Sequence, residues 1–162
     1  GADSARLLAT AGRTLQMTAP PGLIAHSTVT QRRLLNGLVM TPDFHLRQTR
    51  EGRLIAGADF AGGDPGDRPD ETGRKLLDKV RAAVDGTEKL ELAWTTAGKR
   101  PTPADGFPAI GRPVAIEGLY VAVLHSGVTL APIVGELAAR EIAGLGRDAD
   151  LAPYDPDRPE LA

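Results

Sequence analysis

The sequence predicts an α+β fold, and three observations indicate it. Between residues 15 and 60 the chain reads as a series of short strands, two of them joined by the tight connection Arg50-Glu51-Gly52. A single amphipathic helix follows, and later a nearly continuous apolar strand leads directly into a long helix. Strands that follow one another, rather than alternate with helices, favour an antiparallel sheet over a doubly wound parallel one.

The first half of the chain gives most of the expected sheet. The elements expected here are a short helix through 5–12, two short strands within 15–29 broken by Pro20, Pro21 and Gly22, and strands near 38–48, 53–60 and 88–97. A helix near 71–85 comes before the last strand, with Asp70 as its cap. Its apolar stripe is formed by Leu76, Val80 and Val84. The last strand places Leu90, Leu92 and Trp94 on one face.

The second half contributes one strand and one helix. The strand at 119–124 is apolar at nearly every position, which is typical of a strand covered on both faces. The helix runs from Thr129 to about Leu145, and its expected core stripe is Leu130, Ile133, Val134, Leu137, Ile142 and Leu145. The tail from 147 is polar and rich in proline, so we expect it to lie over the surface.

Composition excludes several classes of function. With 41% hydrophobic and 25% charged residues and a net charge of −2, the 162-residue chain suits a globular domain without a basic nucleic-acid-binding stripe. No apolar run approaches the roughly 20 residues of a membrane span, and no signal peptide is visible. The absence of cysteine excludes disulfides and fits a reducing compartment, so we expect a cytoplasmic protein. The three histidines lack metal-site spacing, so no metal is expected.

Two local patterns can carry chemistry. In "LHSGVTLAPIVG" a buried strand turns into a helix, whose free N–H groups can receive an anion or a carbonyl oxygen. Alternatively, Gly127 only shapes the turn and Thr129 only caps the helix. In "AGKRPTPADGFPAIGR" a rigid proline loop follows Arg100, whose guanidinium can grip a carboxylate. Alternatively, Arg100 is a surface residue paired with Asp105, although Asp105 more readily orders the loop through backbone N–H groups.

A hydrolytic triad is disfavoured. Ser126, His125 and Asp105 can be combined on paper, but the chain has no G-x-S-x-G nucleophile elbow. We therefore assign no catalytic acid, base or nucleophile.

Four segments, taken together and in order, resemble the C-terminal half of the D-amino-acid oxidase / glycine oxidase family of FAD-dependent oxidoreductases. They are "GADSARLLATAG", "FHLRQTREGRLIAGADF", "GKRPTPADGFPAIGR" and "EGLYVAVLHSGVTLAPIVGELAAREI". The resemblance covers roughly residues 1 to 145. It implies oxidation of the C–N bond of an amino acid or N-alkyl amino acid to an imine, by hydride transfer to FAD.

The resemblance also implies residue roles. Arg100, in the family's "G-x-R-P" segment, would bind the substrate carboxylate. His45 stands where a tyrosine often lines the family's substrate pocket. The residues that would contact the flavin are His125, Ser126, Gly127, Val128, Thr129 and Leu130. The partner implied is a small amino-acid-like substrate, with no nucleic acid and no membrane span.

The family's N-terminal G-x-G-x-x-G unit, which holds the ADP moiety, is absent from the sequence. We therefore expect residues 1–18 to end an FAD-domain segment, 19–112 to form the substrate-binding domain, 113–146 to return to the FAD domain, and 147–162 to form a tail. The chain alone is then an incomplete, inactive fragment that binds FAD poorly. An exposed apolar patch at 119–124 and 130–134 would favour association, including a homo-oligomer. The alternative is a non-catalytic module that binds a small carboxylate or pairs with a separate nucleotide-binding chain.

Overall fold

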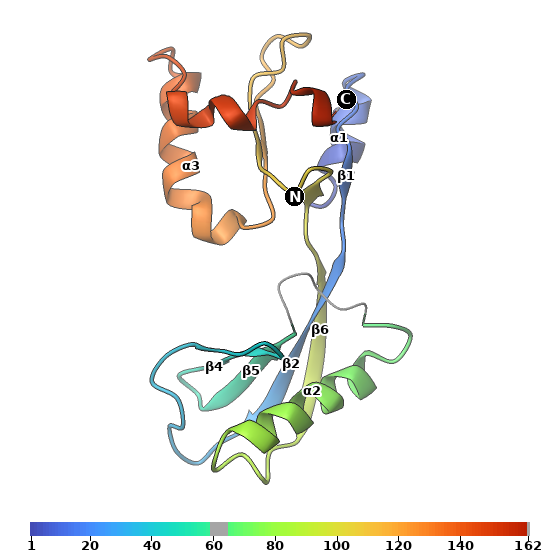
Figure 1. The fold of residues 1–162 in the computed structure, drawn as a ribbon, viewed down its shortest axis with the longest axis vertical. Helices are drawn as coiled ribbons and strands as arrows, with labels where there is room; N and C mark the ends of the chain where they lie inside the picture. The colour runs from blue at the N-terminus through green and yellow to red at the C-terminus, as the bar shows by residue number, and fades with distance from the viewer. Residues whose placement is uncertain (59–64, 162) are drawn as a thin grey trace. The chain divides into compact units, whose positions relative to one another are not determined.

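The computed structural model describes residues 1–58 and 65–161, which combine helices with antiparallel sheets, as the sequence predicts. The chain separates into two compact units (Figure 1). Unit 1 is Gly1–Ala19 with Arg100–Ala162, and unit 2 is Pro20–Lys99. Residues 100–112, which the sequence groups with the substrate-binding domain, therefore lie in unit 1. Among the described residues, no helix is both long and apolar enough to cross a bilayer.

Unit 2 is a five-stranded sheet with one helix. The strands are β2 (Pro21–Val29), β3 (Val39–Met40), β4 (His45–Gln48), β5 (Arg53–Gly57) and β6 (Leu92–Lys99), and the helix is α2 (Pro69–Ala83). Their order across the sheet is β3-β4-β5-β2-β6, and each neighbouring pair is antiparallel. The strands β2 and β6 lie side by side along most of their length (Figure 1). The expected antiparallel sheet is thus present.

Local turn chemistry divides the sheet's first hairpins. The segment expected as one strand near 38–48 is two, because Thr41 Oγ1 accepts the backbone N–H groups of Asp43 and Phe44 at 3.2 and 3.0 Å and turns the chain. The connection between β4 and β5 closes where Gly52 N donates to Thr49 O at 3.1 Å. Gly52 has φ of +89°, a conformation that favours glycine. The expected strand at 53–60 ends at Gly57, and residues 59–60 lie outside the described residues.

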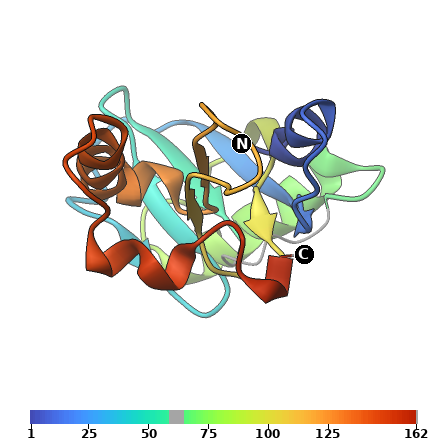
Figure 2. The same ribbon diagram turned by 90° about the horizontal axis from the view of Figure 1, so that it is seen from above.

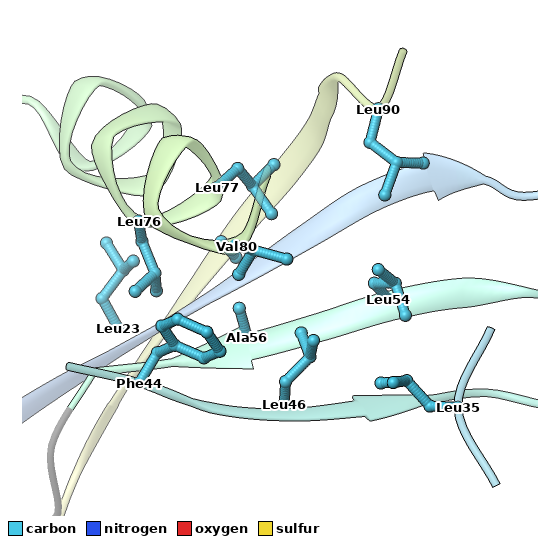
Figure 3. Packing of buried hydrophobic residues seen from close by; sticks show 11 residues of the cluster. Leu23, Leu35, Phe44, Leu46, Leu54, Ala56, Leu76, Leu77, Val80 and Leu90 are labelled. Atoms are coloured by element: carbon cyan, nitrogen blue, oxygen red, sulfur yellow. The ribbon is translucent and has the colours of Figure 1, made fainter. Parts of the chain in front are cut away.

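Helix α2 packs its apolar stripe on one face of the sheet. Its residues Leu76, Leu77 and Val80 point toward Leu46, Leu54 and Ala56, as Figure 3 shows, and these side chains are between 0% and 6% exposed. Gly73 allows this close approach, because a Cβ there would lie 2.5 Å from Thr95 Cγ2. Asp70 is not the cap expected from the sequence. Arg68 holds that position, and Asp70 instead accepts a hydrogen bond from Thr95 Oγ1 at 2.9 Å, which joins α2 to β6.

Trp94 does not share a face with Leu92. The register of β2 against β6 shifts between His26, which pairs with Trp94, and Ser27, which pairs with Leu92. This bulge places Leu92 against the core, while Trp94 stays 43% exposed on the opposite face. The expectation of one shared face was wrong because a bulge changes the two-residue alternation.

Unit 1 contains two small sheets and several helices. The elements are α1 (Ser4–Thr10), β1 (Met17–Thr18), β7 (Thr102–Pro103), β8 (Ala109–Gly111), β9 (Val121–Val123), α3 (Gly127–Ile142) and the 3-10 helices η1 (Ala149–Tyr154) and η2 (Pro159–Leu161). The antiparallel pairs are β1 with β7 and β8 with β9. As predicted, the first helix stops before Gly12, which has φ of +74°. One core cluster joins Leu8 and Leu15 to Val121 and Val123.

The C-terminal tail is part of the unit 1 core, which the sequence did not predict. Leu151 and Leu161 are 2% and 0% exposed, and Leu161 packs in the same cluster as Leu8. Figure 2 shows the tail, in red, leading from the end of α3 to the C-terminus. Arg147 holds the start of this tail by donating to Glu141, to Ile110 O and to Leu151 O at 2.9–3.0 Å. Few but well-placed apolar residues bury a segment that is polar on average.

Helix α3 and strand β9 are less covered than the sequence predicts. Within the described residues, only Leu137 of the α3 stripe is buried, whereas Ile133, Ile142 and Leu145 are 50%, 53% and 72% exposed. Strand β9 buries Val121 and Val123 but exposes Ala122, so one face is packed and the other is open. The described elements of unit 1 therefore cover only one face of β9 and only part of the α3 stripe.

Candidate functional site

The turn between β9 and α3 leaves a helix N-terminus open. Ser126 occupies the N-cap position but makes no capping hydrogen bond, because its Oγ lies 2.9 Å from Nδ1 of the neighbouring His125. The first backbone bond of the helix runs from Leu130 N to Ser126 O at 3.0 Å. The N–H groups of Gly127, Val128 and Thr129 therefore have no partner within the helix. Thr129 lies inside the helix, so the alternative that it serves as the cap was wrong.

The surroundings of this helix end leave its backbone N–H groups open to a ligand. A Cβ on Gly127 would meet nothing within 4 Å, and Val128 is 94% exposed, so the backbone N–H groups can be approached closely. They carry the positive end of the helix dipole, which suits a carbonyl oxygen or a ring nitrogen with negative charge. Of the expected contact residues, His125 and Thr129 are also exposed, and Ser126 and Leu130 are partly buried.

Arg100 directly follows β6 and begins the second segment of unit 1. Its side chain is partly buried, and it forms no ion pair with any carboxylate among residues 1–58 and 65–161. The carboxylate that the sequence offers as its partner is occupied. Asp105 accepts from Arg158 Nε at 2.7 Å and Arg158 Nη2 at 2.9 Å, and also orders its own loop by accepting from Phe107 N at 3.1 Å. The guanidinium of Arg100 is therefore available for a ligand.

The Asp105–Arg158 pair makes the folding stability of unit 1 depend on pH. The hydrogen bonds from Arg158, ahead of the Phe107 N–H, hold the pKa of Asp105 below its usual value. A lowered carboxyl pKa contributes stability that is complete above about pH 4 and is lost as pH falls through the folded-state pKa. Arg158→Ala should lower the free energy of unfolding of unit 1 by about 1.5–3 kcal/mol at pH 7 and flatten its decline below pH 4.

Urea unfolding followed by tyrosine absorbance measures this effect, because both tyrosines of the chain, Tyr120 and Tyr154, lie in unit 1. The exposed Arg140→Ala is the control. An unchanged acid dependence in Arg158→Ala would show that the pair does not stabilise the loop.

His45 lies on the face of the unit 2 sheet opposite α2. Its neighbour Leu46 is fully buried against the helix, so the alternation of the strand turns His45 the other way. Across the sheet His45 pairs with Gly57, and a Cβ on Gly57 would overlap the His45 imidazole. The ring thus lies over the backbone of Gly57. Arg100 and the α3 turn belong to unit 1, and His45 belongs to unit 2.

Gly57→Ala tests whether this contact positions the imidazole. The added methyl group should displace the ring and lower the stability of unit 2 by about 1–3 kcal/mol, the usual cost of overpacking. Chemical shifts of the His45 ring in NMR spectra measure the displacement, and Gly98→Ala, which has open space, is the control. Unchanged His45 shifts in Gly57→Ala would contradict the packing.

Sequence reasoning missed a cluster on the same sheet face. His26 and Trp94 stack with ring centroids 4.8 Å apart and an interplanar angle of 16°, and the guanidinium of Arg53 lies 4.4 Å from the Trp94 ring centroid. The signal available in the sequence was the single tryptophan of the chain, in a strand with no other aromatic residue. The bulge that turns Trp94 to this face has no sequence signature of its own.

Most of the chain, including the segments that contain the β5 hairpin, Arg100 and the β9–α3 turn, matches the model of a known family. The model of FAD-dependent oxidoreductases, which includes the D-amino-acid oxidases, matches residues 1–141. The chain belongs to this family.

Individual relatives agree with the assignment. Glycine oxidase of Bacillus licheniformis is 35% identical over 96 residues, which are 57% of this chain and 26% of that protein. The uncharacterised oxidoreductase YurR of Bacillus subtilis is 31% identical over 125 residues, or 74% of this chain and 34% of that protein. The structure of glycine oxidase from Geobacillus kaustophilus has a TM-score of 0.80 and 28% identity, covering 98% of this chain and 44% of that one. This chain thus spans less than half the length of each of these relatives.

Proposed function

We propose that the chain forms the substrate-carboxylate-binding and flavin-contacting part of an FAD-dependent oxidoreductase that oxidises the C–N bond of an amino acid or N-alkyl amino acid to an imine. Bound FAD would supply the hydride acceptor. The residues of the chain would bind the substrate and orient its α-carbon. No acid or base of the chain is required when the amine binds in its neutral form.

The observation that carries this proposal is the availability of Arg100. Among the described residues no carboxylate pairs with it, while the nearby Asp105 is held by Arg158. A guanidinium presents a planar fork that matches a carboxylate, and the proline loop behind Arg100 limits its backbone freedom. The glycine oxidases among the relatives act, by name, on a substrate that bears a carboxylate. We assign the same group of the substrate to Arg100, and the pocket wall to His45.

The open N-terminus of α3 supports a flavin contact. Residues His125 to Leu130 would meet the ring edge, with the N–H groups of Gly127, Val128 and Thr129 stabilising negative charge there. The positive end of the helix dipole acts in the same direction.

We further propose that a nucleotide-binding segment, on the same or a separate chain, completes the protein. The relatives are more than twice as long as their match to this chain. The open faces of α3 and β9 in unit 1 support this, as does the apolar hollow beside α1 lined by Leu7, Leu119 and Ala122. In this arrangement residues 1–18 and 113–146 belong with the nucleotide-binding segment and 19–112 with the substrate. A non-catalytic module that binds a small carboxylate through Arg100 is the second candidate.

Flavin content separates the two candidates. The 162-residue chain and the product of the longest reading frame that encodes it are purified side by side, and their visible spectra and intact masses are compared. We expect stoichiometric flavin on the longer product and little on the 162-residue chain. Flavin on neither protein, together with binding of a simple carboxylate, would favour the non-catalytic module.

A further inference from the structure

The C-terminal tail contacts the loop that follows Arg100. Arg158 of the tail binds Asp105 of the loop, which lies 53 residues earlier in the chain. Its Nε donates to Asp105 Oδ2 at 2.7 Å and its Nη2 donates to Asp105 Oδ1 at 2.9 Å, so the contact is bidentate. The two side chains are only 11% and 17% exposed. A bidentate, nearly buried ion pair of this kind holds both side chains in one orientation.

The other donors of Arg158 also bind the protein. Its Nη2 donates to Phe107 O at 3.1 Å, and its Nη1 donates to Asp155 O at 2.9 Å. Four of the five N–H donors of the guanidinium are thus used within unit 1. Arg158 therefore holds the loop by both side chain and backbone, and is itself held by the tail.

The loop is also attached to β1, but only over a short stretch. The strand β7 pairs with β1 over two residues, and Ala104 N donates to Gln16 O at 2.9 Å. A ladder of this length is marginal on its own. Asp105 comes directly after Ala104, so its contact with Arg158 fixes the end of the segment that lies farther from Arg100.

Arg100 stands at the other end of this segment. Pro101 and Pro103 fix two of the φ angles between Arg100 and Asp105, so the chain between them is stiff. Fixing Asp105 therefore restricts where the backbone of Arg100 lies. Within the described part of the chain, the side chain of Arg100 makes no hydrogen bond or ion pair. The place of its guanidinium thus depends on the placement of its backbone.

We propose that Arg158 is a positioning residue, which holds the loop through Asp105 so that Arg100 meets the substrate carboxylate. This inference rests on the proposed function, in which Arg100 binds that carboxylate. All three residues belong to unit 1. A displacement of about 1 Å at a group that binds the substrate can cost about a hundredfold in rate. Loss of Arg158 should therefore weaken the binding of an acid substrate, in addition to its cost in stability.

Steady-state kinetics on the flavin-containing product of the longest reading frame test the proposal. In Arg158→Gln we expect KM for an amino-acid substrate to rise at least about tenfold, and KM for the matching uncharged amine to change less than about twofold. Arg158→Lys keeps the charge without the planar fork and should recover part of the loss. Arg140→Gln, at an exposed position, is the control. Equal losses for acid and amine, or less folded enzyme with an unchanged KM, would overturn the proposal.

Asp105→Asn is a second variant that removes the same ion pair. The amide still offers one oxygen to Phe107 N, so the turn of the loop keeps that hydrogen bond. We expect KM for the acid to rise at least about threefold, again without an effect on the amine. Because both changes remove one contact, Asp105→Asn combined with Arg158→Gln should raise KM no more than the larger single effect. Multiplied effects would show that the two residues act separately and would overturn the proposal.

The Arg100 side chain also reports on its position without turnover. In nitrogen–proton NMR spectra of the 162-residue chain, the Nε–Hε signal of Arg100 is assigned by its loss in Arg100→Lys. We expect this signal to shift in Arg158→Gln and to stay in place in Arg140→Gln. An unshifted signal in Arg158→Gln would overturn the proposal.

The same variants separate failure of this inference from failure of the proposed function. If Arg100→Ala affects the acid alone while Arg158→Gln leaves KM unchanged, this inference fails and the proposed function stands. If Arg100→Ala affects acid and amine equally, the proposed function fails, and the NMR spectra decide whether Arg158 positions Arg100.

Discussion

Arg100→Ala lowers kcat/KM for an amino-acid substrate by on the order of ten- to several-hundred-fold, if Arg100 binds the substrate carboxylate as proposed. A hydrogen bond to a charged group contributes about 1.5–3 kcal/mol, and a carboxylate left in a water-poor pocket without its partner costs more. Arg100→Lys should recover only part of the loss, because an ammonium group lacks the planar fork. Folding stability should change little, since within the described part of the chain the Arg100 side chain makes no hydrogen bond or ion pair that holds unit 1 together. Steady-state kinetics on the flavin-containing protein measure the effect.

The matching uncharged amine is the control substrate, and the neighbouring exposed Lys99→Ala is the control variant. Because only the acid can use the guanidinium, the loss should be confined to it. Equal losses for acid and amine would rule out the carboxylate contact. Unchanged kinetics would remove Arg100 from the site.

Leu54→Ala destabilises unit 2 by about 2–5 kcal/mol, the usual cost of removing a fully buried leucine side chain. Leu54 is 0% exposed on β5 and packs in the cluster that joins the sheet to α2 (Figure 3). Unit 2 contains Trp94, so urea unfolding followed by tryptophan fluorescence reports on this unit. Val29→Ala, at a 51% exposed position of β2, is the control and should change the free energy of unfolding by well under 1 kcal/mol. Similar losses in the two variants would contradict the packing of α2 on the sheet.

Strong local signals explain what the sequence predicted correctly. The hairpin between β4 and β5 was predicted from Arg50-Glu51-Gly52, and the positive φ of Gly52 confirms the reason. Helix α2 was predicted from a stripe at helical spacing, and Leu76 and Val80 are buried as expected. Both elements are specified by residues close together in the chain.

Contacts between distant residues explain what the sequence did not predict. The face of Trp94 depends on a bulge between β2 and β6. The burial of Leu161 depends on Leu8 and Leu15, more than a hundred residues away, and Leu151 packs against Ile110 and Leu137. The α3 stripe was expected to be buried, yet Ile133 and Leu145 are exposed among the described residues. A hydrophobic pattern indicates that a face needs a partner, but not which segment supplies it.

The candidate site was foreseen in part. Arg100 and the α3 turn were singled out from local residue patterns, whereas His45 and the specific roles came from the family resemblance, and these roles stay proposals. The sequence left open whether Asp105 pairs with Arg100, and the structure shows Asp105 paired with Arg158. The sequence did not predict this pair, because Arg158 lies in the proline-rich tail that was expected to lie over the surface. The stacked pair of His26 and Trp94 was missed because it forms only when β2 and β6 are placed in register.

Anaerobic titration of the flavin with substrate tests the central claim most directly. The product of the longest reading frame that encodes the chain is mixed, without oxygen, with acidic and neutral amino acids and with N-methylglycine, and the visible spectrum is recorded. Our account predicts that at least one of them reduces the flavin fully, with one keto or aldehyde product released per flavin, and that Arg100→Ala slows this reduction at least about tenfold. If dithionite reduces the flavin but none of these compounds reduces it, the assignment of this chain to amino-acid oxidation would be contradicted.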